Sequence, residues 1–585
     1  MTAMAERPAI EDLLAAAVAE HVPMSVDEVR ALISVPPAAD MGDYALPCFP
    51  LARALRKAPN AIAAELQTLV RLPDGIVASR AVGPYLNFSA DRAGQTACIL
   101  AAICRAGRLY GAAEVGAGRT VVFEYSSPNI AKHLGVHHLP GTIIGRTLCR
   151  IFERLGYTVV AVNFLGDWGT GFGKLIAAVE RYGVDDVASL TVDDLQGLYV
   201  RYSREAEEDP ALTEAARAAA LRLERGEKRA VHCWETFRAV SLAEFEHAYE
   251  RLGVAFDRYT PESEYRGRMA ETLRSMQEAG VAVESEGALI VRFDAEEMPP
   301  LLVRTGDGRS LYATRDIPAA IDRWETYRFD RSVYVVGNEQ SLYLNQVRAA
   351  LRRMGHEWAD RVVHVNFGLI KFLDAETGQA RKGSTRRGEL LLLEEVLDEA
   401  VARARVKIAQ NADRFEEGAD LDALAEQVGI GAVLFRQMSV RRTRDVVFDW
   451  DRMLDFEGDT GPYVQYAHAR LCSILRKAGG EVPEQVDFGL LCMPEEWTLV
   501  RHLERFPRTI LRAAREYEPS VIATHLLELC ADFSSYYSAG MKEPDRRVLC
   551  EDERVRAARL KLVDAVRHVI RSGLELLGIA VPERM

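Results

Sequence analysis

Residues 126–138 bring together several side chains that can hold a phosphorylated ligand. They read Ser-Ser-Pro-Asn-Ile-Ala-Lys-His-Leu-Gly-Val-His-His. Lys132 supplies a mobile cation suited to phosphate, and Asn129 can hydrogen-bond a small polar ligand. His137 and His138 lie where a helix is expected to start, and the free backbone N–H groups of a helix start favour anions. These residues therefore predict a phosphate site at which histidine can stabilise a phosphoryl group in a transition state.

Three nearby histidines also have two plainer interpretations. His133, His137 and His138 can be ordinary surface residues, or they can belong to a weak metal site. A structural zinc site has four protein ligands, and the sequence places no fourth ligand nearby. The nine cysteines are scattered without a Cys-x-x-Cys pair, which argues against a zinc ribbon and a disulfide framework. We expect no zinc and no other metal held by the protein itself.

Apolar runs on both sides of this segment indicate how it is positioned. Residues 120–125 and 158–164 are typical of strands, and residues 139–155 are typical of a helix between them. Residues 332–337 form another short apolar run of the kind found in parallel sheets. Strand, loop, helix and strand in this order predict a nucleotide-binding fold with residues 126–138 at the carboxyl end of a strand.

The 585 residues are too many for one core, and three regions are expected. Residues 1–110 combine helical patterns with a strand-like ending and predict a small α+β domain. Residues 111–395 hold the nucleotide-binding pattern, with a charge-rich and mostly helical insertion at about 175–300. Residues 396–585 show amphipathic helical patterns and no convincing strand, which predicts a helical bundle.

Charge and hydropathy exclude some classes of protein. The net charge of −13 argues against unspecific binding of polyanions, but it does not exclude a shaped RNA site with local positive charge. No apolar run approaches the length of roughly 18 residues that a membrane-spanning helix needs. The first residues have no apolar signal core, so we expect a cytoplasmic protein without membrane association.

Several segments resemble, in the same order, the signatures of arginyl-tRNA synthetases, which are class I aminoacyl-tRNA synthetases. They are Ser-Pro-Asn-Ile-Ala-Lys at 127–132, Gly-Asp-Trp-Gly-Thr-Gly-Phe-Gly at 166–173, Leu-Tyr-Ala-Thr-Arg-Asp at 311–316, Val-Gly-Asn-Glu-Gln at 336–340, Thr-Gly-Pro-Tyr-Val-Gln-Tyr-Ala-His-Ala-Arg at 460–470 and Gly-Ile-Ala-Val-Pro-Glu-Arg-Met at 578–585. The resemblance covers nearly the whole chain and implies a multidomain α/β protein. Its parts would be a Rossmann-like catalytic domain with a helical insertion, a small N-terminal α+β domain that touches the tRNA elbow, and a C-terminal all-α anticodon-binding bundle.

The resemblance implies an arginine pocket. Its residues would be Glu124, Ser127, Asn129, His138, Tyr312, Asp316 and Gln340. Tyr312 and Asp316 match the family's guanidinium readers, and four residues apart they face one side of a helical turn. A guanidinium and a carboxylate form a planar, charge-assisted pair, whereas citrulline would leave Asp316 uncompensated at a cost of roughly 2–5 kcal/mol. The family's usual histidine three positions after Gln340 is Tyr343 here.

The nucleotide half departs from the family pattern. The family's H-x-G-H motif is Gly135-Val-His137-His138 here, so only the second histidine is kept. His133 is a candidate for the missing donor. Residues 381–388 resemble the family's K-M-S-K-S-type loop, whose cations would cover the pyrophosphate. The expected catalytic residues are His138, Lys132, Lys382 and His133, and those expected to bind ATP are Gly135, His137, His138, Lys382, Ser384 and Arg386.

RNA contacts are expected on the N-terminal domain and on the bundle. The residues implied by the resemblance are Asn87, Tyr463, Gln465, Tyr466 and Arg470. Two groups of arginines can contact phosphates, although such rows are usually solvated helix faces. The groups are Arg436, Arg441, Arg442 and Arg444, and Arg501, Arg505, Arg508, Arg512 and Arg515.

The resemblance implies an arginine–tRNA ligase that uses ATP with Mg²⁺, needs bound tRNA for adenylation and requires no zinc. Its partners would be L-arginine and tRNA(Arg), and the chain would act as a monomer. Two alternatives stay open because the arginine readers match while the ATP signature is altered. One is a paralogue with changed nucleotide chemistry that performs a specialised arginyl transfer. The other is a non-catalytic protein that binds arginine or tRNA.

Overall fold

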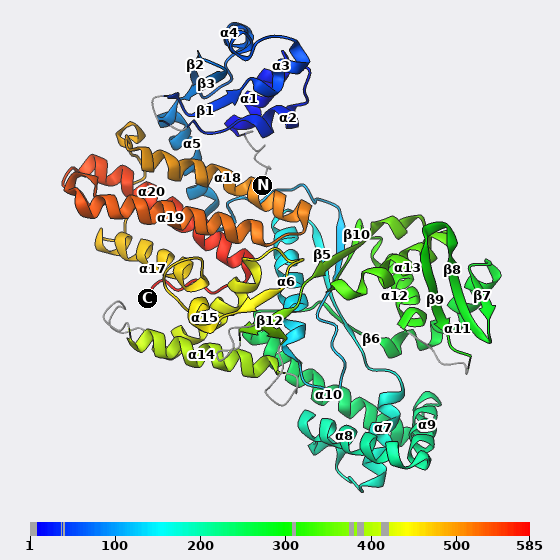
Figure 1. Ribbon diagram of the computed structural model, residues 1–585. Helices are drawn as coiled ribbons and strands as arrows, with labels where there is room; N and C mark the ends of the chain where they lie inside the picture. Colours follow the sequence, from blue (N-terminus) through cyan, green and yellow to red (C-terminus); the bar gives the residue numbers. More distant parts are fainter. Residues whose placement is uncertain are drawn as a thin grey trace.

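The computed structural model describes residues 9–36, 38, 41–306, 312–373, 380–382, 391–410 and 420–585. They form a multidomain α/β protein, as predicted (Figure 1). None of the described helices is long and apolar enough to cross a membrane.

The N-terminal part is a small α+β unit. Its antiparallel sheet has the order β1-β3-β2, and a single helix, α5, leads from it to the rest of the chain (Figure 1). Its elements are α1 (Ile10–Ala19), α2 (Val26–Leu32), β1 (Tyr44–Pro47), α3 (Phe49–Leu55), α4 (Pro59–Leu69), β2 (Ile76–Val82), β3 (Tyr85–Ala90) and α5 (Arg92–Ala106).

A five-stranded parallel sheet with the order β11-β10-β4-β5-β6 forms the centre of the molecule. The strands are β4 (Thr120–Glu124), β5 (Thr158–Leu165), β6 (Arg258–Pro261), β10 (Arg331–Gly337) and β11 (Val362–Phe367). Helix α6 (Leu139–Arg154) connects β4 to β5 and packs closely against β4, β5 and β10 of the sheet. A methyl group on Gly145 would lie 2.2 Å from the ring of Tyr125, so only glycine permits this approach.

Between β5 and β6 the chain leaves the sheet and forms a helical insertion, seen below the sheet in Figure 1. Its helices are α7 (Thr170–Arg181), α8 (Val192–Glu208), α9 (Pro210–Glu224) and α10 (Lys228–Arg251). After β6 follow α11 (Arg266–Glu278), an antiparallel sheet of β7 (Ala282–Ser285), β8 (Ala288–Phe293) and β9 (Met298–Arg304), and then α12 (Tyr312–Tyr327) and α13 (Ser341–Arg353). This antiparallel sheet was not predicted, and its strands β7 and β8 lie in the segment that was expected to be mostly helical, although alternate residues of β8 are buried as in a one-sided strand.

The C-terminal part is the predicted helical bundle, with one short strand that was not predicted. Its helices are α14 (Leu393–Gln410), α15 (Leu421–Met438), α16 (Trp450–Met453), α17 (Gly461–Lys477), α18 (Pro494–Glu516), α19 (Ser520–Lys542) and α20 (Glu553–Leu577). The short strand β14 (Val446–Phe448) pairs with β12 (Ile370–Leu373), which also pairs with β13 (Ala380–Lys382).

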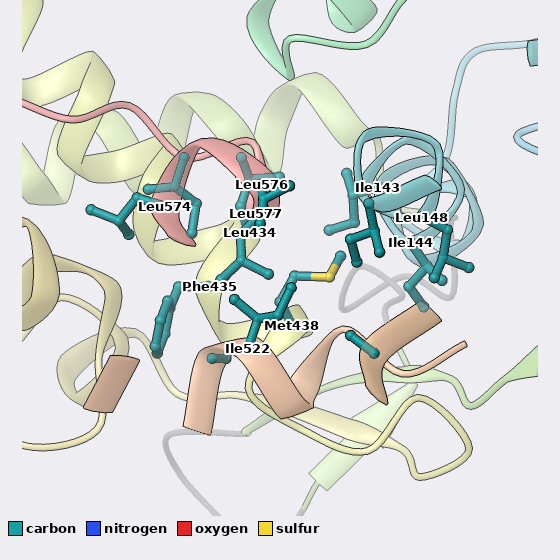
Figure 2. Close-up of a cluster of buried hydrophobic side chains, with 14 of the residues drawn as sticks. Ile143, Ile144, Leu148, Leu434, Phe435, Met438, Ile522, Leu574, Leu576 and Leu577 are labelled. Atoms are coloured by element: carbon teal, nitrogen blue, oxygen red, sulfur yellow. The ribbon is translucent and has the colours of Figure 1, made fainter. Parts of the chain in front are cut away.

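The bundle packs directly on the helix that follows the 126–138 loop. Figure 2 shows Ile143, Ile144 and Leu148 of α6 facing apolar side chains of α15, α19 and α20. The partners labelled there are Leu434, Phe435, Met438, Ile522, Leu574, Leu576 and Leu577. Burial of this apolar surface joins the bundle and the parallel sheet into one core.

Candidate active site

The loop after β4 is held in an unusual backbone conformation. Ser126, Ser127 and Ala131 have φ angles of 71°, 48° and 60°, in the left-handed region that residues other than glycine rarely adopt. Such strain persists only where neighbouring groups impose it, and it is frequent at ligand sites. Here Ser127 N–H donates to Asn163 Oδ1 at 3.1 Å, and Ala131 N–H donates to Ser241 Oγ at 2.8 Å.

The insertion and the β5 end also hold the polar side chains of this loop. Tyr249 OH of α10 lies 2.7 Å from Ser126 Oγ. Asn129 is exposed, and its Oδ1 lies so close to Gly166 that a Cβ atom there would be 2.0 Å away. The Oγ of Ser127 is buried and has no hydrogen-bond partner among the described residues. A strained loop with an exposed amide and an unpaired hydroxyl is suited to binding a polar ligand.

His138 is a neutral imidazole held against the backbone of Gly135. Its Nδ1 lies 3.2 Å from both the N–H and the carbonyl oxygen of Gly135, so the proton is on Nε2 when Nδ1 accepts from the N–H and on Nδ1 when it donates to the carbonyl. Burial and the neighbouring His137 lower the pKa of His138 to about 3, so the ring is uncharged at neutral pH. It stands directly before α6, but the start of this helix offers few free donors, because the N–H groups of His138 and Leu139 bond Gly135 O and Val136 O and Pro140 has no N–H. Burial is the larger cause that lowers the pKa of His137, and the positive charge of nearby, exposed Lys132 lowers it further.

His133 is engaged by the insertion. Its Nδ1 lies 2.8 Å from Glu244 of α10, and its Nε2 lies 3.0 Å from Asp193 of α8. Burial acts to lower the pKa of this imidazole, but the hydrogen bonds to both carboxylates outweigh burial and raise it. Both ring nitrogens therefore have partners, and in this conformation neither is available to a phosphate.

The second nucleotide motif is tied to the first by the backbone. Val136 N–H donates to Leu391 O at 2.9 Å, and Leu393 N–H donates to Leu134 O at 2.8 Å. Lys382 ends strand β13, but its side chain is not described, and Ser384 and Arg386 lie outside the described residues. The chain thus re-emerges from this motif directly beside the loop that carries His137 and His138.

The predicted guanidinium readers lie around the first turns of α12. Asp316 accepts a hydrogen bond from Tyr343 OH of α13 and has no ion pair among the described residues. Tyr312 begins the same helix, one turn before Asp316, but its side chain is outside the described residues. Glu124 is buried at the end of β4 and forms an ion pair with buried Arg323, so it faces a guanidinium of the protein itself.

The charges of this region leave one carboxylate uncompensated. Glu262 pairs with Arg315 and Glu124 pairs with Arg323, while the partner of Asp316 among the described side chains is the phenol of Tyr343. Burial and the nearby Glu124 raise the pKa of Asp316 to about 6. Burial raises the pKa of Glu262 to about 7, against the opposing effect of Arg315. A buried carboxylate with a raised pKa is well placed to receive a cation from outside.

Other residues of the site emerge only from the structure. Arg323 and Tyr249 carry no motif, although Arg323 lies seven residues after Asp316 and thus on the same helix face. Gln340 is exposed in the short helix η7 (Asn338–Gln340), which directly follows the β10 strand.

The residues predicted to touch RNA divide into accessible and buried ones. Arg470 of α17 donates to Tyr466 OH at 3.0 Å and lies over the rings of Tyr466 and Tyr537, which forms a partly exposed aromatic and cationic surface. Tyr463 OH lies 3.1 Å from Ser534 Oγ and is partly exposed. Gln465 is buried and donates to the carbonyls of Gln427 and Ala580. Asn87 of β3 is buried as well, so in this conformation neither amide reaches a ligand surface.

Part of the two arginine groups surrounds one cavity of about 640 Å³ between α1, α18, α19 and the segment after α15. Arg441 and Arg444 are exposed and form no ion pair within the described parts of the chain. Arg505 and Arg508 pair instead with Glu11 of α1, at 3.0 Å each. The remaining lining arginine is Arg512, which pairs with Glu516.

Comparison with known proteins identifies the family. The model of the class I tRNA synthetase (R) catalytic domain matches residues 100–450, that of the DALR anticodon-binding domain matches residues 464–585, and that of the arginyl-tRNA synthetase N-terminal domain matches residues 8–90. An arginine–tRNA ligase of Clostridium perfringens is 42% identical over 98% of this chain and 99% of its own length. One of Clostridium beijerinckii is 43% identical over 97% and 98%.

Solved structures agree with the sequence relatives. The arginyl-tRNA synthetase of Thermus thermophilus superposes with a TM-score of 0.78 and 28% identity, over 99% of this chain and 100% of that chain. That of Plasmodium falciparum, at 20% identity, has a TM-score of 0.79 over the full length of both chains and shows the same fold. The chain belongs to the arginyl-tRNA synthetases, a family of class I aminoacyl-tRNA synthetases.

Proposed function

We propose that this protein is an arginine–tRNA ligase, which activates L-arginine with ATP and transfers it to tRNA(Arg). The observation that carries this proposal is Asp316, a partly buried carboxylate without an ion-pair partner among the described residues, beside a Glu124 that Arg323 already neutralises. Such a site is short of one positive charge, which the guanidinium of arginine supplies. Lysine would lack the planar fork of donors.

In the first step the arginine carboxylate attacks the α-phosphorus of ATP, the bond to the β-phosphate bridging oxygen breaks, and pyrophosphate leaves. Exposed Asn129 and Gln340 can hold the backbone end of arginine, with Ser127 beside them. In the tautomer whose Nδ1 accepts from the Gly135 N–H, His138 can donate its Nε2–H to a phosphate oxygen without adding a full charge. Lys132 and Lys382 are candidates to neutralise the phosphates. Mg²⁺ would enter with the nucleotide and stabilise the leaving pyrophosphate.

In the second step a terminal ribose hydroxyl of tRNA attacks the arginyl carbonyl, and AMP leaves. The aromatic and cationic surface of Tyr466, Arg470 and Tyr537 is suited to unpaired bases of an anticodon. We also propose that the enzyme is monomeric and cytoplasmic and that its adenylation step requires bound tRNA. The catalytic work is positioning and charge stabilisation, without a covalent intermediate on the protein.

Arginine-dependent exchange of pyrophosphate into ATP, measured with and without tRNA(Arg), tests this function. Exchange that requires arginine supports the proposal, and a further requirement for tRNA supports the coupling of the two substrates. Absence of exchange under both conditions, together with tight tRNA binding, would instead support a non-catalytic binding protein. Transfer of arginine to another acceptor would support the specialised paralogue.

A further inference from the structure

Among the described residues, the hydrogen bond that the Asp316 carboxylate accepts comes from Tyr343. The phenol O–H donates to Asp316 Oδ2 from the first turn of α13, just after the η7 segment that carries Gln340. Burial and the negative charge of Asp316 raise the pKa of this phenol well above its usual value, so it stays protonated and donates to the carboxylate. The phenol therefore holds Oδ2, while Oδ1 makes no hydrogen bond among the described residues and is the oxygen more open to a ligand.

The charged groups that face Asp316 come from several elements. Glu124 of β4 raises its pKa, while Arg315 and Arg323 of α12 lower it. Glu262, after β6, and Tyr334 of β10 also face this carboxylate. Arg315 forms an ion pair with Glu262 and Arg323 with Glu124, while the hydrogen bond that Asp316 accepts among the described residues comes from the Tyr343 phenol.

A neutral donor solves a specific problem at this position. The site must keep Asp316 ionised without placing a second cation against the substrate guanidinium. A hydrogen bond to the ionised form stabilises a carboxylate, and a phenol gives this bond with no positive charge at any working pH. A histidine at this position would become a cation below about pH 6.5 and would repel the guanidinium.

We propose that Tyr343 is a positioning residue for arginine recognition, which anchors Asp316 Oδ2 and turns Oδ1 toward the substrate guanidinium. This inference rests on the proposed function. It assigns to one phenol both the orientation and the charge state of the guanidinium reader. The effect is on arginine binding, because Tyr343 does not contact the described parts of the nucleotide loop.

The test is arginine binding by calorimetry between pH 5 and pH 8, with Tyr343→Phe and the control Tyr327→Phe. Tyr327 is a partly buried tyrosine at the end of the same α12 helix, packed in the same apolar cluster. Tyr343→Phe should bind arginine about tenfold more weakly at pH 7, and its loss of binding on acidification should begin at a higher pH than in the wild type. Tyr327→Phe should keep the wild-type affinity and pH profile.

Equal affinity and an unchanged pH profile in Tyr343→Phe would overturn the inference. If wild-type protein showed no arginine-dependent exchange and no arginine binding, the proposed function would fail instead, so the two failures are distinguishable. If Tyr343→Phe does not fold, the binding of arginine by Tyr343→His tests the inference instead. This variant should bind arginine well at pH 8 and lose affinity more steeply than the wild type below about pH 6.5, and a profile identical to the wild type would refute the assignment.

Discussion

Asp316→Asn should stabilise the free protein while it abolishes arginine binding. In the folded protein burial raises the pKa of Asp316 from its usual 3.8 to about 6. Because the folded state holds this proton more tightly than the unfolded state, ionisation of Asp316 costs folding free energy that grows from about pH 4 and is fully present above about pH 6. A difference of about two pH units between the two pKa values corresponds to about 3 kcal/mol at pH 7.

The asparagine has the same shape, can accept the hydrogen bond of Tyr343 with its carbonyl oxygen, and carries no charge. It also leaves Glu124 and Glu262 balanced by Arg323 and Arg315. At pH 7 we expect the thermal midpoint of the ligand-free variant to exceed that of the wild type by roughly a few degrees. Near pH 4, where Asp316 is protonated in the wild type, the two midpoints should nearly coincide.

Differential scanning calorimetry of both proteins at these two pH values, with and without arginine, measures the effect. Arginine should raise the midpoint of the wild type only. A lower midpoint for Asp316→Asn at pH 7 would refute the reasoning, because it would mean that a cation already compensates the carboxylate in the free protein. Arginine-induced stabilisation of the variant would refute the assignment of Asp316 as the guanidinium reader.

Three further outcomes are expected from other parts of the structure. His138→Ala should lower the rate of pyrophosphate exchange by roughly 10²–10³-fold with little change in the KM for arginine, and a change confined to that KM would contradict the phosphate role. Because its pKa is lowered to about 3, the wild-type rate should show no inflection from His138 near pH 6.5. Arg323→Ala should destabilise the protein by about 3–5 kcal/mol, since it leaves Glu124 buried and unpaired. In urea unfolding, the double variant Arg323→Ala with Glu124→Gln should lose clearly less free energy of unfolding than Arg323→Ala alone. Simple addition of the two single effects would contradict the pairing. Arg441→Glu with Arg444→Glu should weaken tRNA binding in a filter assay and reduce its salt dependence, while an unchanged salt slope would exclude phosphate contacts at this cavity.

The central βαβ unit was predictable from local pattern. The apolar runs at 120–125, 139–155 and 158–164 correspond to β4, α6 and β5 within one or two residues. Their burial on all sides makes them nearly continuous apolar runs, which is a strong signal. The helical bundle was predictable from a different local signal, the 3.6-residue periodicity of helices that each bury one apolar face.

The electrostatic partners were not predictable. His133 meets Asp193 and Glu244 because the insertion folds back over the loop, and the direction of that return is a property of tertiary packing. Glu124 has the sequence context of a substrate reader, yet its cation is an arginine of α12. Motif position identifies which residues gather at a site, but the allocation of charges among them depends on distances that only the fold sets.

The backbone ladder between residues 134–136 and 391–393 has a thermodynamic consequence. It joins the loop that carries His137 and His138 to the start of α14, and α14 packs against α15 of the bundle. A ligand that displaces these helices must therefore strain or shift Gly135, and a nucleotide that reshapes the loop must move the start of α14. Linkage makes such an effect reciprocal: whatever factor RNA contributes to nucleotide affinity, the nucleotide returns to RNA affinity.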